Sequence, residues 1–162
     1  MTFFNNKIKY IIFFLFTILL VFIDQLTKYF AKINLKGKSP FVIIDNILEF
    51  VYVENTGAAF GVFKGRMVLF YILTIVVLCA ILYFLYKLDF NKFNLLYFII
   101  LLLIFSGAIG NFIDRVKNQF VVDFIYFKPI DFPVFNFADI CITCGCIIMI
   151  LSMFTIYKND LL

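Results

Sequence analysis

Four long apolar stretches constrain the fold of this chain more than any other feature of its sequence. Each can cross a bilayer as a helix, which takes about 20 residues. They cover residues 10–33, 67–86, 95–113 and 140–157. Hydrophobic residues make up 65% of the chain and charged residues 15%, whereas soluble domains hold about 45–50% and 25%. We therefore expect an all-α membrane protein, with residues 1–162 forming one domain built on a four-helix transmembrane bundle.

The lengths of the connections predict the topology of this bundle. Residues 87–94 form a short polar turn, which makes the second and third spans antiparallel neighbours. The longer connections, residues 34–66 and 114–139, then emerge on the opposite side of the membrane, and both termini lie on the side of the short turn. Residues 47–53 are β-branched and aromatic between turn residues, which predicts a strand. Residues 120–122 and 128–133 suit short strands or extended loop on the membrane surface.

The absence of histidine excludes several kinds of chemistry. Ser-His-Asp and Cys-His hydrolysis need an imidazole base, and most zinc hydrolases need imidazole ligands. The cysteines fall within apolar spans and are interpreted as packing residues, with neither a disulfide framework nor a thiolate metal site. We expect no metal or cofactor. The basic residues are scattered singly, which argues against nucleic acid as a partner.

Carboxylates gather at one end of the predicted bundle. Asp24 lies late in the first span, Asp114 just past the third, Asp123 in the second long connection and Asp139 at the start of the fourth span. Two helical stripes of small and polar residues accompany them and would let helices approach closely. These stripes are Gly107, Gly110, Asn111 and Asp114, and Asn136, Asp139, Thr143 and Cys146.

Structural explanations compete with a functional one for most of these acids. Asp24 and Lys28 are spaced i, i+4 and could only neutralise each other near the interface. Asp114 with the next residue, arginine, could end the third span at the headgroups. Asn136 and Asp139 have the spacing of a helix cap and could only cap the fourth span. Asp123 lies among apolar residues, which give no structural reason for a carboxylate.

Two neighbouring carboxylates can perform hydrolysis without histidine or metal. They cannot both ionise cheaply, so one holds a proton while the other stays anionic. The anion can take a proton from water while the neutral acid polarises a peptide carbonyl. A site at the membrane surface favours substrates embedded in lipid, such as a hydrophobic peptide or a peptide that carries acyl chains.

Five motifs in one order resemble the bacterial lipoprotein signal peptidases, or signal peptidase II, a family of integral-membrane aspartic proteases. They are D-Q-L-T-K (24–28), N-T-G-A-A-F-G (55–61), G-A-I-G-N-F-I-D-R (107–115), V-V-D-F-I (121–125) and F-P-V-F-N-F-A-D (132–139). The family usually has a glycine pair where this chain has Ser106 and Gly107. A serine is still small and can hydrogen-bond along its own helix, so close packing should survive.

The resemblance implies an enzyme of the bacterial plasma membrane that removes signal peptides from prolipoproteins, cutting just before the diacylglyceryl-modified cysteine. Asp123 and Asp139 match its catalytic pair. The first long connection corresponds to the family's small extracytoplasmic β-cradle. Expected partners are diacylglyceryl-modified prolipoproteins and membrane lipids, and a monomer is expected. The positions that match residues lining or supporting the family's site are Asp24, Lys28, Asn55, Gly57, Gly107, Asn111, Asp114, Arg115 and Asn136.

The charge distribution and the resemblance disagree about orientation. The family has both termini in the cytoplasm and its site near the extracytoplasmic surface. Five lysines lie on the terminal side of the predicted bundle, against eight basic residues on the other side. The positive-inside rule alone would favour the reverse orientation. We adopt the family orientation, because the first span usually dominates and Lys7 and Lys9 directly precede it.

Two other classes of protein remain as alternatives. A small transporter or proton channel would also hold carboxylates among its spans, but near the bilayer midplane and often at broken helices with inverted repeats. The sequence shows neither broken helices nor inverted repeats. A scaffold protein without enzymatic activity would have no use for the clustered aspartates and asparagines.

Overall fold

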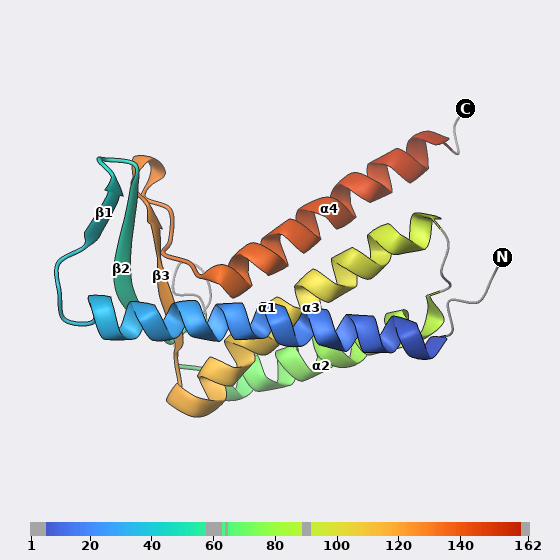
Figure 1. Ribbon diagram of the computed structural model, residues 1–162, viewed down its shortest axis with the longest axis horizontal. Helices are drawn as coiled ribbons and strands as arrows, with labels where there is room; N and C mark the ends of the chain where they lie inside the picture. Colours follow the sequence, from blue (N-terminus) through green and yellow to red (C-terminus); the bar gives the residue numbers. More distant parts are fainter. Residues whose placement is uncertain (1–5, 58–62, 64, 89–91, 160–162) are drawn as a thin grey trace.

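The computed structural model describes residues 6–57, 63, 65–88 and 92–159. Within those ranges it contains four helices long and apolar enough to cross a membrane, which confirms the predicted fold class (Figure 1). Their bounds are α1 Asn6–Leu35, α2 Met67–Lys87, α3 Lys92–Asn118 and α4 Phe137–Asn159.

The helices extend beyond the apolar stretches that predicted them. The third begins at Lys92 rather than residue 95 and ends at Asn118 rather than residue 113. Asp114 and Arg115 therefore lie inside α3 and not beyond its end. Polar residues continue this helix because neighbouring elements supply hydrogen-bond and ionic partners for them. A hydropathy pattern does not show such partners.

A small antiparallel sheet covers one end of the bundle. Its strands are β1 Phe41–Ile44, β2 Leu48–Asn55 and β3 Val121–Phe127, in the order β1-β2-β3. The strand predicted at residues 47–53 corresponds to β2. β1 was not predicted, because it is a short strand at the sheet edge whose four residues are all exposed.

The segment after β3 differs in part from its prediction. Lys128–Ile130 forms a short 3-10 helix (η2), because Pro129 fits the first turn of a helix, where a backbone N–H is not needed. The chain then returns along β3. The backbone N–H of Phe135 donates to the carbonyl of Ile125, and Ile125 N–H donates to the carbonyl of Phe135. This pairing holds residues 132–135 beside β3 and leads directly into α4.

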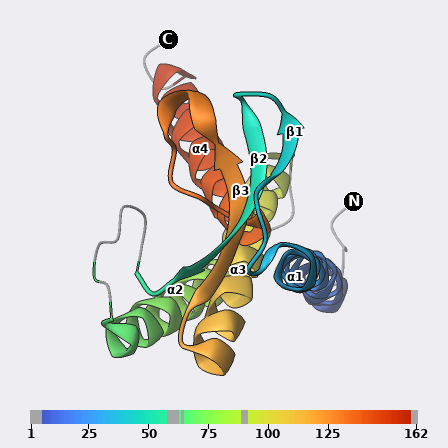
Figure 2. The ribbon, with the colours of Figure 1, turned by 90° about the vertical axis from the view of Figure 1, so that its left-hand side faces the viewer.

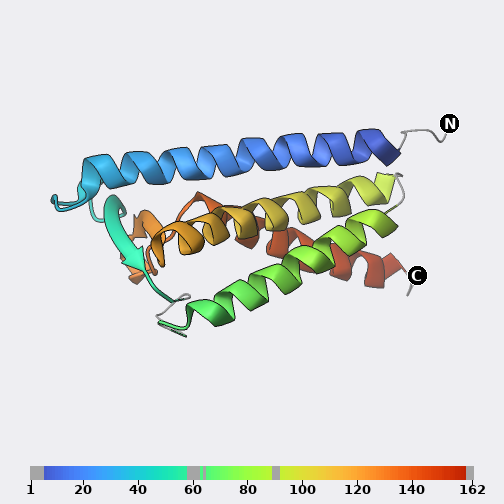
Figure 3. The same cartoon turned by 90° about the horizontal axis from the view of Figure 1, so that it is seen from below.

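The helix ends alternate between the two ends of the bundle, as the predicted antiparallel order requires. The sheet lies at one end of the bundle, whereas the start of α1, the end of α2, the start of α3 and the end of α4 lie at the other (Figures 1 and 3). α3 is the central helix and contacts α1, α2 and α4. The core of the bundle is aromatic, with the ring centroid of Phe13 on α1 5.6 Å from that of Phe98 and 5.3 Å from that of Phe105.

A buried lysine joins α1 to the end of α2. Lys9 is only 1% exposed, and its Nζ donates to the carbonyl oxygens of Leu85 at 2.9 Å and Leu88 at 2.8 Å. Helix C-termini leave carbonyl groups without helical partners, and a cation satisfies them well. Lys9 is therefore a C-terminal cap that comes from a different helix.

Candidate active site

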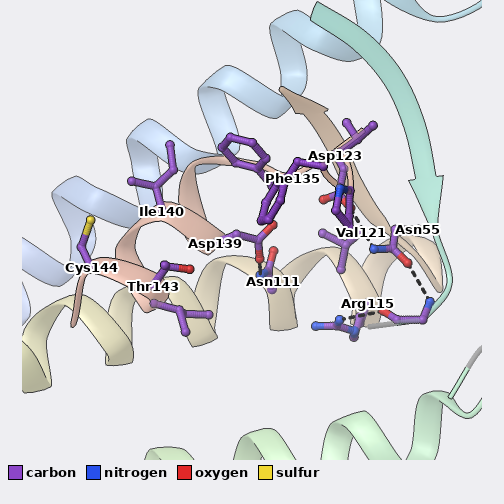
Figure 4. Close-up of a pocket in the computed structure, with 15 residues that line it drawn as sticks. Asn55, Asn111, Arg115, Val121, Asp123, Phe135, Asp139, Ile140, Thr143 and Cys144 are labelled. Atoms are coloured by element: carbon purple, nitrogen blue, oxygen red, sulfur yellow. Dashed lines mark hydrogen bonds between the residues drawn. The ribbon is translucent and has the colours of Figure 1, made fainter. Parts of the chain in front are cut away.

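A pocket of about 420 Å³ opens where α3, α4 and the sheet meet (Figure 4). It has a polar side formed by asparagine, arginine and aspartate, and an apolar side formed by residues 132–135 and the first turns of α4. The residues that line it are Asn55, Gly57, Asn111, Arg115, Val121, Asp123, Phe132, Pro133, Val134, Phe135, Asp139, Ile140, Ile142, Thr143 and Cys144. Both aspartates that the sequence predicts as catalytic are therefore in one pocket.

Asp123 is held by two asparagines from different elements. It lies on β3, is 2% exposed, and accepts hydrogen bonds from Asn55 Nδ2 on Oδ2 at 2.8 Å and from Asn136 Nδ2 on Oδ1 at 2.6 Å. Burial, and then the negative charge of Asp139, raise the pKa of Asp123 from 3.8 to about 7. The two aspartates are therefore close enough to affect each other's charge, as expected of a carboxylate pair.

Asp139 lies in the first turn of α4 and caps that helix. The backbone N–H of Asn136 donates to Asp139 Oδ2 at 3.1 Å, and Asp139 N–H donates to Asn136 Oδ1 at 3.0 Å. This reciprocal pattern is a capping box, so the structural explanation for this spacing is correct. It does not exclude a site role, because Asp139 also lines the pocket and its Oδ1 accepts a bond from Asn111 Nδ2 at 2.7 Å.

Two asparagines connect the aspartates, Asn111 at the wall of the pocket and Asn136 behind it. Asn136 is fully buried and donates through Nδ2 to both Asp123 and Asn111, the latter bond being 3.2 Å long. Asn111 in turn donates to Asp139. An unbroken line of side-chain hydrogen bonds therefore runs from Asp123 through Asn136 and Asn111 to Asp139, and it fixes the relative positions of the two carboxyl groups.

A buried ionic cluster supports this line of hydrogen bonds. The Nζ of Lys28 lies 2.9 Å from Asp24, 3.2 Å from Asp114 and 3.0 Å from the Oδ1 of Asn111. Asp24 accepts the backbone N–H of Ala138, and Asp114 accepts the backbone N–H of Val122. The pair Asp24 and Lys28 is thus real, and both side chains are buried. It joins α1 to α3, to the start of α4 and to β3.

Asp114 and Arg115 do more than end a span at the headgroups. Asp114 is 3% exposed within the ionic cluster. The Arg115 guanidinium faces the pocket, lies 4.4 Å from the ring centroid of Phe70, and donates to the carbonyl of Gly57 at 3.4 Å. Gly57 N–H also donates to Asn55 Oδ1 at 2.9 Å. Arg115 and Asn55 together therefore hold the chain that follows β2.

Glycines let α3 approach its neighbours. A Cβ added to Gly107 would overlap the backbone oxygen of Ala138, and one added to Gly110 would lie 2.5 Å from Asp24 Oδ2. The small stripe predicted on the third span is thus confirmed as a close contact with α4 and α1. Ser106 is buried, and its hydroxyl donates to Leu102 O at 2.7 Å, so it hydrogen-bonds along its own helix as expected.

The predicted site residues fall into two layers. Six line the pocket: Asn55, Gly57, Asn111, Arg115, Asp123 and Asp139. The other five lie behind it and contact these six or position the helices that carry them: Asp24, Lys28, Gly107, Asp114 and Asn136. The structure therefore brings all eleven residues to the sheet end of the bundle.

Two further residues of this region were not among the predicted site residues. Gln25 donates to Asp24, to Asp114 and to the carbonyl of Gly110, whereas the sequence indicates it only as one letter of the D-Q-L-T-K motif. Tyr71 on α2 donates to the carbonyl of Arg115 at 2.9 Å. An amide next to a buried acid was a usable signal for Gln25. Nothing in the local sequence distinguishes Tyr71 from other aromatic residues of the spans.

Comparisons with known proteins agree with the geometry. The family model described as signal peptidase (SPase) II matches residues 16–155. A lipoprotein signal peptidase of Lactobacillus johnsonii is 34% identical over 155 residues, covering 96% of this chain and 99% of that protein. One of Staphylococcus aureus is 40% identical over 141 residues, covering 86% and 85%.

Solved structures support the same relationship. A bacterial membrane enzyme solved by the in meso method superposes with a TM-score of 0.85 at 35% identity, covering 98% of this chain and 93% of the other. A second such structure gives a TM-score of 0.78 at 37% identity, covering 94% and 95%. These matches favour neither a transporter nor a scaffold, and the chain belongs to the signal peptidase II family of bacterial, multi-pass aspartic peptidases.

Proposed function

We propose that this protein removes the signal peptide from prolipoproteins by cleaving on the N-terminal side of the diacylglyceryl-modified cysteine, with Asp123 and Asp139 as the catalytic pair. One observation carries the proposal. Both carboxyl groups line a single pocket, and hydrogen bonds through Asn136 and Asn111 fix their relative position. The membership of the family supplies the class of substrate.

The carboxylate pair activates a water molecule. Asp123 holds a proton below about pH 7, because burial and the charge of Asp139 raise its pKa to about 7. The ionised member takes a proton from water, whose oxygen bonds to the scissile carbonyl carbon while the protonated member hydrogen-bonds to the carbonyl oxygen. Collapse of the tetrahedral intermediate breaks the C–N bond, and a carboxyl group gives its proton to the leaving amine.

The shape of the pocket suits a substrate that stays in the lipid. Its polar end holds the aspartates, and its apolar lining continues along α4 through Ile140, Ile142 and Cys144. α4 packs on α3, whereas its outer face carries exposed apolar side chains, including Ile147 and Leu151. A hydrophobic peptide or an acylated cysteine can therefore approach from the bilayer without leaving an apolar environment.

The same proposal includes location and assembly. The site lies at the sheet end of the bundle. We place that end at the extracytoplasmic surface of the plasma membrane, with the start of α1 and the end of α4 on the cytoplasmic side. This orientation follows the family rather than the charge count.

The active unit is a monomer, because one chain supplies both aspartates and both asparagines that connect them.

Cleavage by purified protein tests this function directly. The substrate is a synthetic peptide that carries a diacylglyceryl cysteine, presented in detergent micelles. Asp123→Asn and Asp139→Asn should each reduce kcat by at least about a thousandfold, the usual order for removal of an essential catalytic group. Asp131→Asn is the matched control, since Asp131 is an exposed aspartate in the segment after β3 that does not line the pocket.

Each outcome of this assay has a clear meaning. Full activity of the control with loss in both variants supports the pair. Retained turnover in either variant removes that residue from the catalytic pair. Cleavage of the parent peptide at another bond, or equal cleavage of a peptide without the diacylglyceryl group, contradicts the proposed specificity.

A further inference from the structure

A second pocket lies on the other side of the sheet from the aspartates. It has a volume of about 710 Å³ and is formed by the end of α1, the turn after it and the sheet. β3 separates the two pockets, because Asp123 lines the first and its neighbour Phe124 lines the second. Figure 2 looks onto the sheet end of the molecule and shows β3 between α4 and α1. The residues that line the second pocket are Thr27, Phe30, Ala31, Asn34, Leu35, Lys38, Ser39, Pro40, Phe41, Phe50 and Phe124.

The inner surface of this pocket is apolar. Ala31, Val122 and Phe124 form a buried cluster, and the ring of Phe50 packs edge-on against that of Phe124 with 5.9 Å between centroids. Phe30 and Phe41 extend the apolar surface outward and are more than half exposed. A cavity of this composition accepts an alkyl chain better than it accepts water or a polar solute.

The rim of the pocket is polar and positively charged. Gly37 adopts a left-handed conformation that ends α1, and the N–H of Lys38 donates back to Leu35 O, so the turn places Lys38 at the mouth. Among the described residues that line this pocket none is acidic. The Nζ of Lys36 lies 2.7 Å from Oε1 of Glu54 and forms an ion pair with it. The ammonium of Lys38 has no carboxylate partner in the described part of the chain.

The position of the pocket fits the headgroup region of a bilayer. It lies at the sheet end of α1, where the helix leaves the apolar core and its residues change from apolar to lysine and asparagine. Exposed Tyr29 is in the same turns, and aromatic residues of this kind are typical of membrane interfaces. An apolar cavity below a lysine is therefore at the depth where acyl chains meet phosphate groups.

We propose that this second pocket binds an anionic glycerophospholipid of the surrounding bilayer. One acyl chain occupies the cavity between Phe30, Phe50 and Phe124, and the phosphate lies beside Lys38 with Asn34 and Ser39 as hydrogen-bond donors. The diacylglyceryl group of a substrate is a poorer occupant, because it is neutral and its cysteine must reach Asp123 on the opposite side of β3. The site is independent of the catalytic assignment.

Binding of a short-chain lipid to the purified protein tests this site. The probe is dioctanoyl phosphatidylglycerol in a zwitterionic detergent, and the bound fraction is measured by native mass spectrometry, with dioctanoyl phosphatidylcholine as the neutral-headgroup comparison. Lys38→Gln should raise the Kd for the anionic lipid about fivefold, the usual contribution of one basic residue near a membrane surface. Lys117→Gln, which changes an exposed lysine of α3 at the same end, should leave the Kd unchanged.

A second pair of variants tests the apolar part. Phe41→Ser should weaken binding of the lipid, whereas Val42→Ser should not, because Val42 is an exposed neighbour on β1 that does not line the pocket. Cleavage in pure detergent should be the same in all four variants, which shows that they are folded.

Three results would overturn the proposal. One is an unchanged Kd in Lys38→Gln, and another is equally tight binding of phosphatidylcholine. The third is displacement of phosphatidylglycerol by neutral dioctanoylglycerol or by the diacylated substrate peptide, which would make the pocket a substrate subsite.

Discussion

Replacing Asp123 with asparagine should make the protein more stable at alkaline pH while it abolishes activity. The folded protein raises the pKa of Asp123 from 3.8 to about 7, because the side chain is buried and the negative charge of Asp139 is near it. Below about pH 4 the carboxyl is protonated in both folded and unfolded states, so its altered pKa does not lower the free energy of unfolding. Between pH 4 and 7 the unfolded state ionises while the folded state does not, so the free energy of unfolding falls as pH rises.

The size of this effect follows from the pKa change. A difference of roughly 3 pKa units corresponds to about 4 kcal/mol at 1.36 kcal/mol per unit. The full loss is present above pH 7, where both states are ionised. Asparagine does not titrate. The free energy of unfolding of Asp123→Asn minus that of the parent should therefore increase by about 4 kcal/mol between pH 4 and pH 8.

The pH dependence of the difference is the quantity to measure. Asparagine places an NH₂ group opposite the amide donors of Asn55 or Asn136 and so costs about 1–3 kcal/mol at every pH. Unfolding in detergent, followed by circular dichroism across pH 4–8, gives the difference directly. On the scale of soluble proteins of this size the change corresponds to a shift in Tm on the order of 10 °C. A difference in stability that does not vary with pH would refute the reasoning.

Three further predictions concern other contacts. Lys9→Met should lower the free energy of unfolding by about 1–3 kcal/mol and should spare kcat at permissive temperature. It removes the ammonium that caps the carbonyls of Leu85 and Leu88, and within the described part of the chain Leu85 O keeps only the 3.4 Å bond from the N–H of Leu88. An unchanged Tm would contradict the capping role. Gly110→Ala should lower both stability and cleavage, because its Cβ would displace the Asp24 carboxyl, and parent-like values of both would contradict the close contact. The value of kcat/KM should fall about tenfold per pH unit above about pH 7 as Asp123 loses its proton, and a profile that stays flat to pH 9 would contradict the assignment of the proton.

The sequence predicted the spans well because lipid exposure leaves a strong and local signal. Runs of about 20 apolar residues determine the helices, and the connection lengths determine their antiparallel order. Boundaries were less predictable. α3 continues through Asp114 because Lys28, Gln25 and the N–H of Val122 provide partners for that carboxylate. Such partners come from elements distant in sequence.

The sequence predicts which residues belong to the site better than it predicts how those residues are arranged. Helical spacing brought Gly107, Gly110 and Asn111 to one stripe. Asp123 stood out because its apolar neighbours give no structural reason for a carboxylate, and the resemblance to a known family paired it with Asp139. The division into pocket-lining and supporting residues depends on contacts between elements that are distant in sequence. Asn136 illustrates this: its spacing to Asp139 correctly predicts a helix cap, yet its side-chain amide also bonds to Asp123, which no local pattern indicates.

A double-variant comparison in single-turnover cleavage tests most directly whether the two aspartates act as one catalytic unit. The substrate is the diacylated peptide, and the chemical step is measured for Asp123→Asn, Asp139→Asn and the protein that carries both changes. If the pair shares one proton and one water, the double variant should be no slower than the slower single variant. Losses that multiply, or a single variant that still cleaves at the parent's rate, would contradict it.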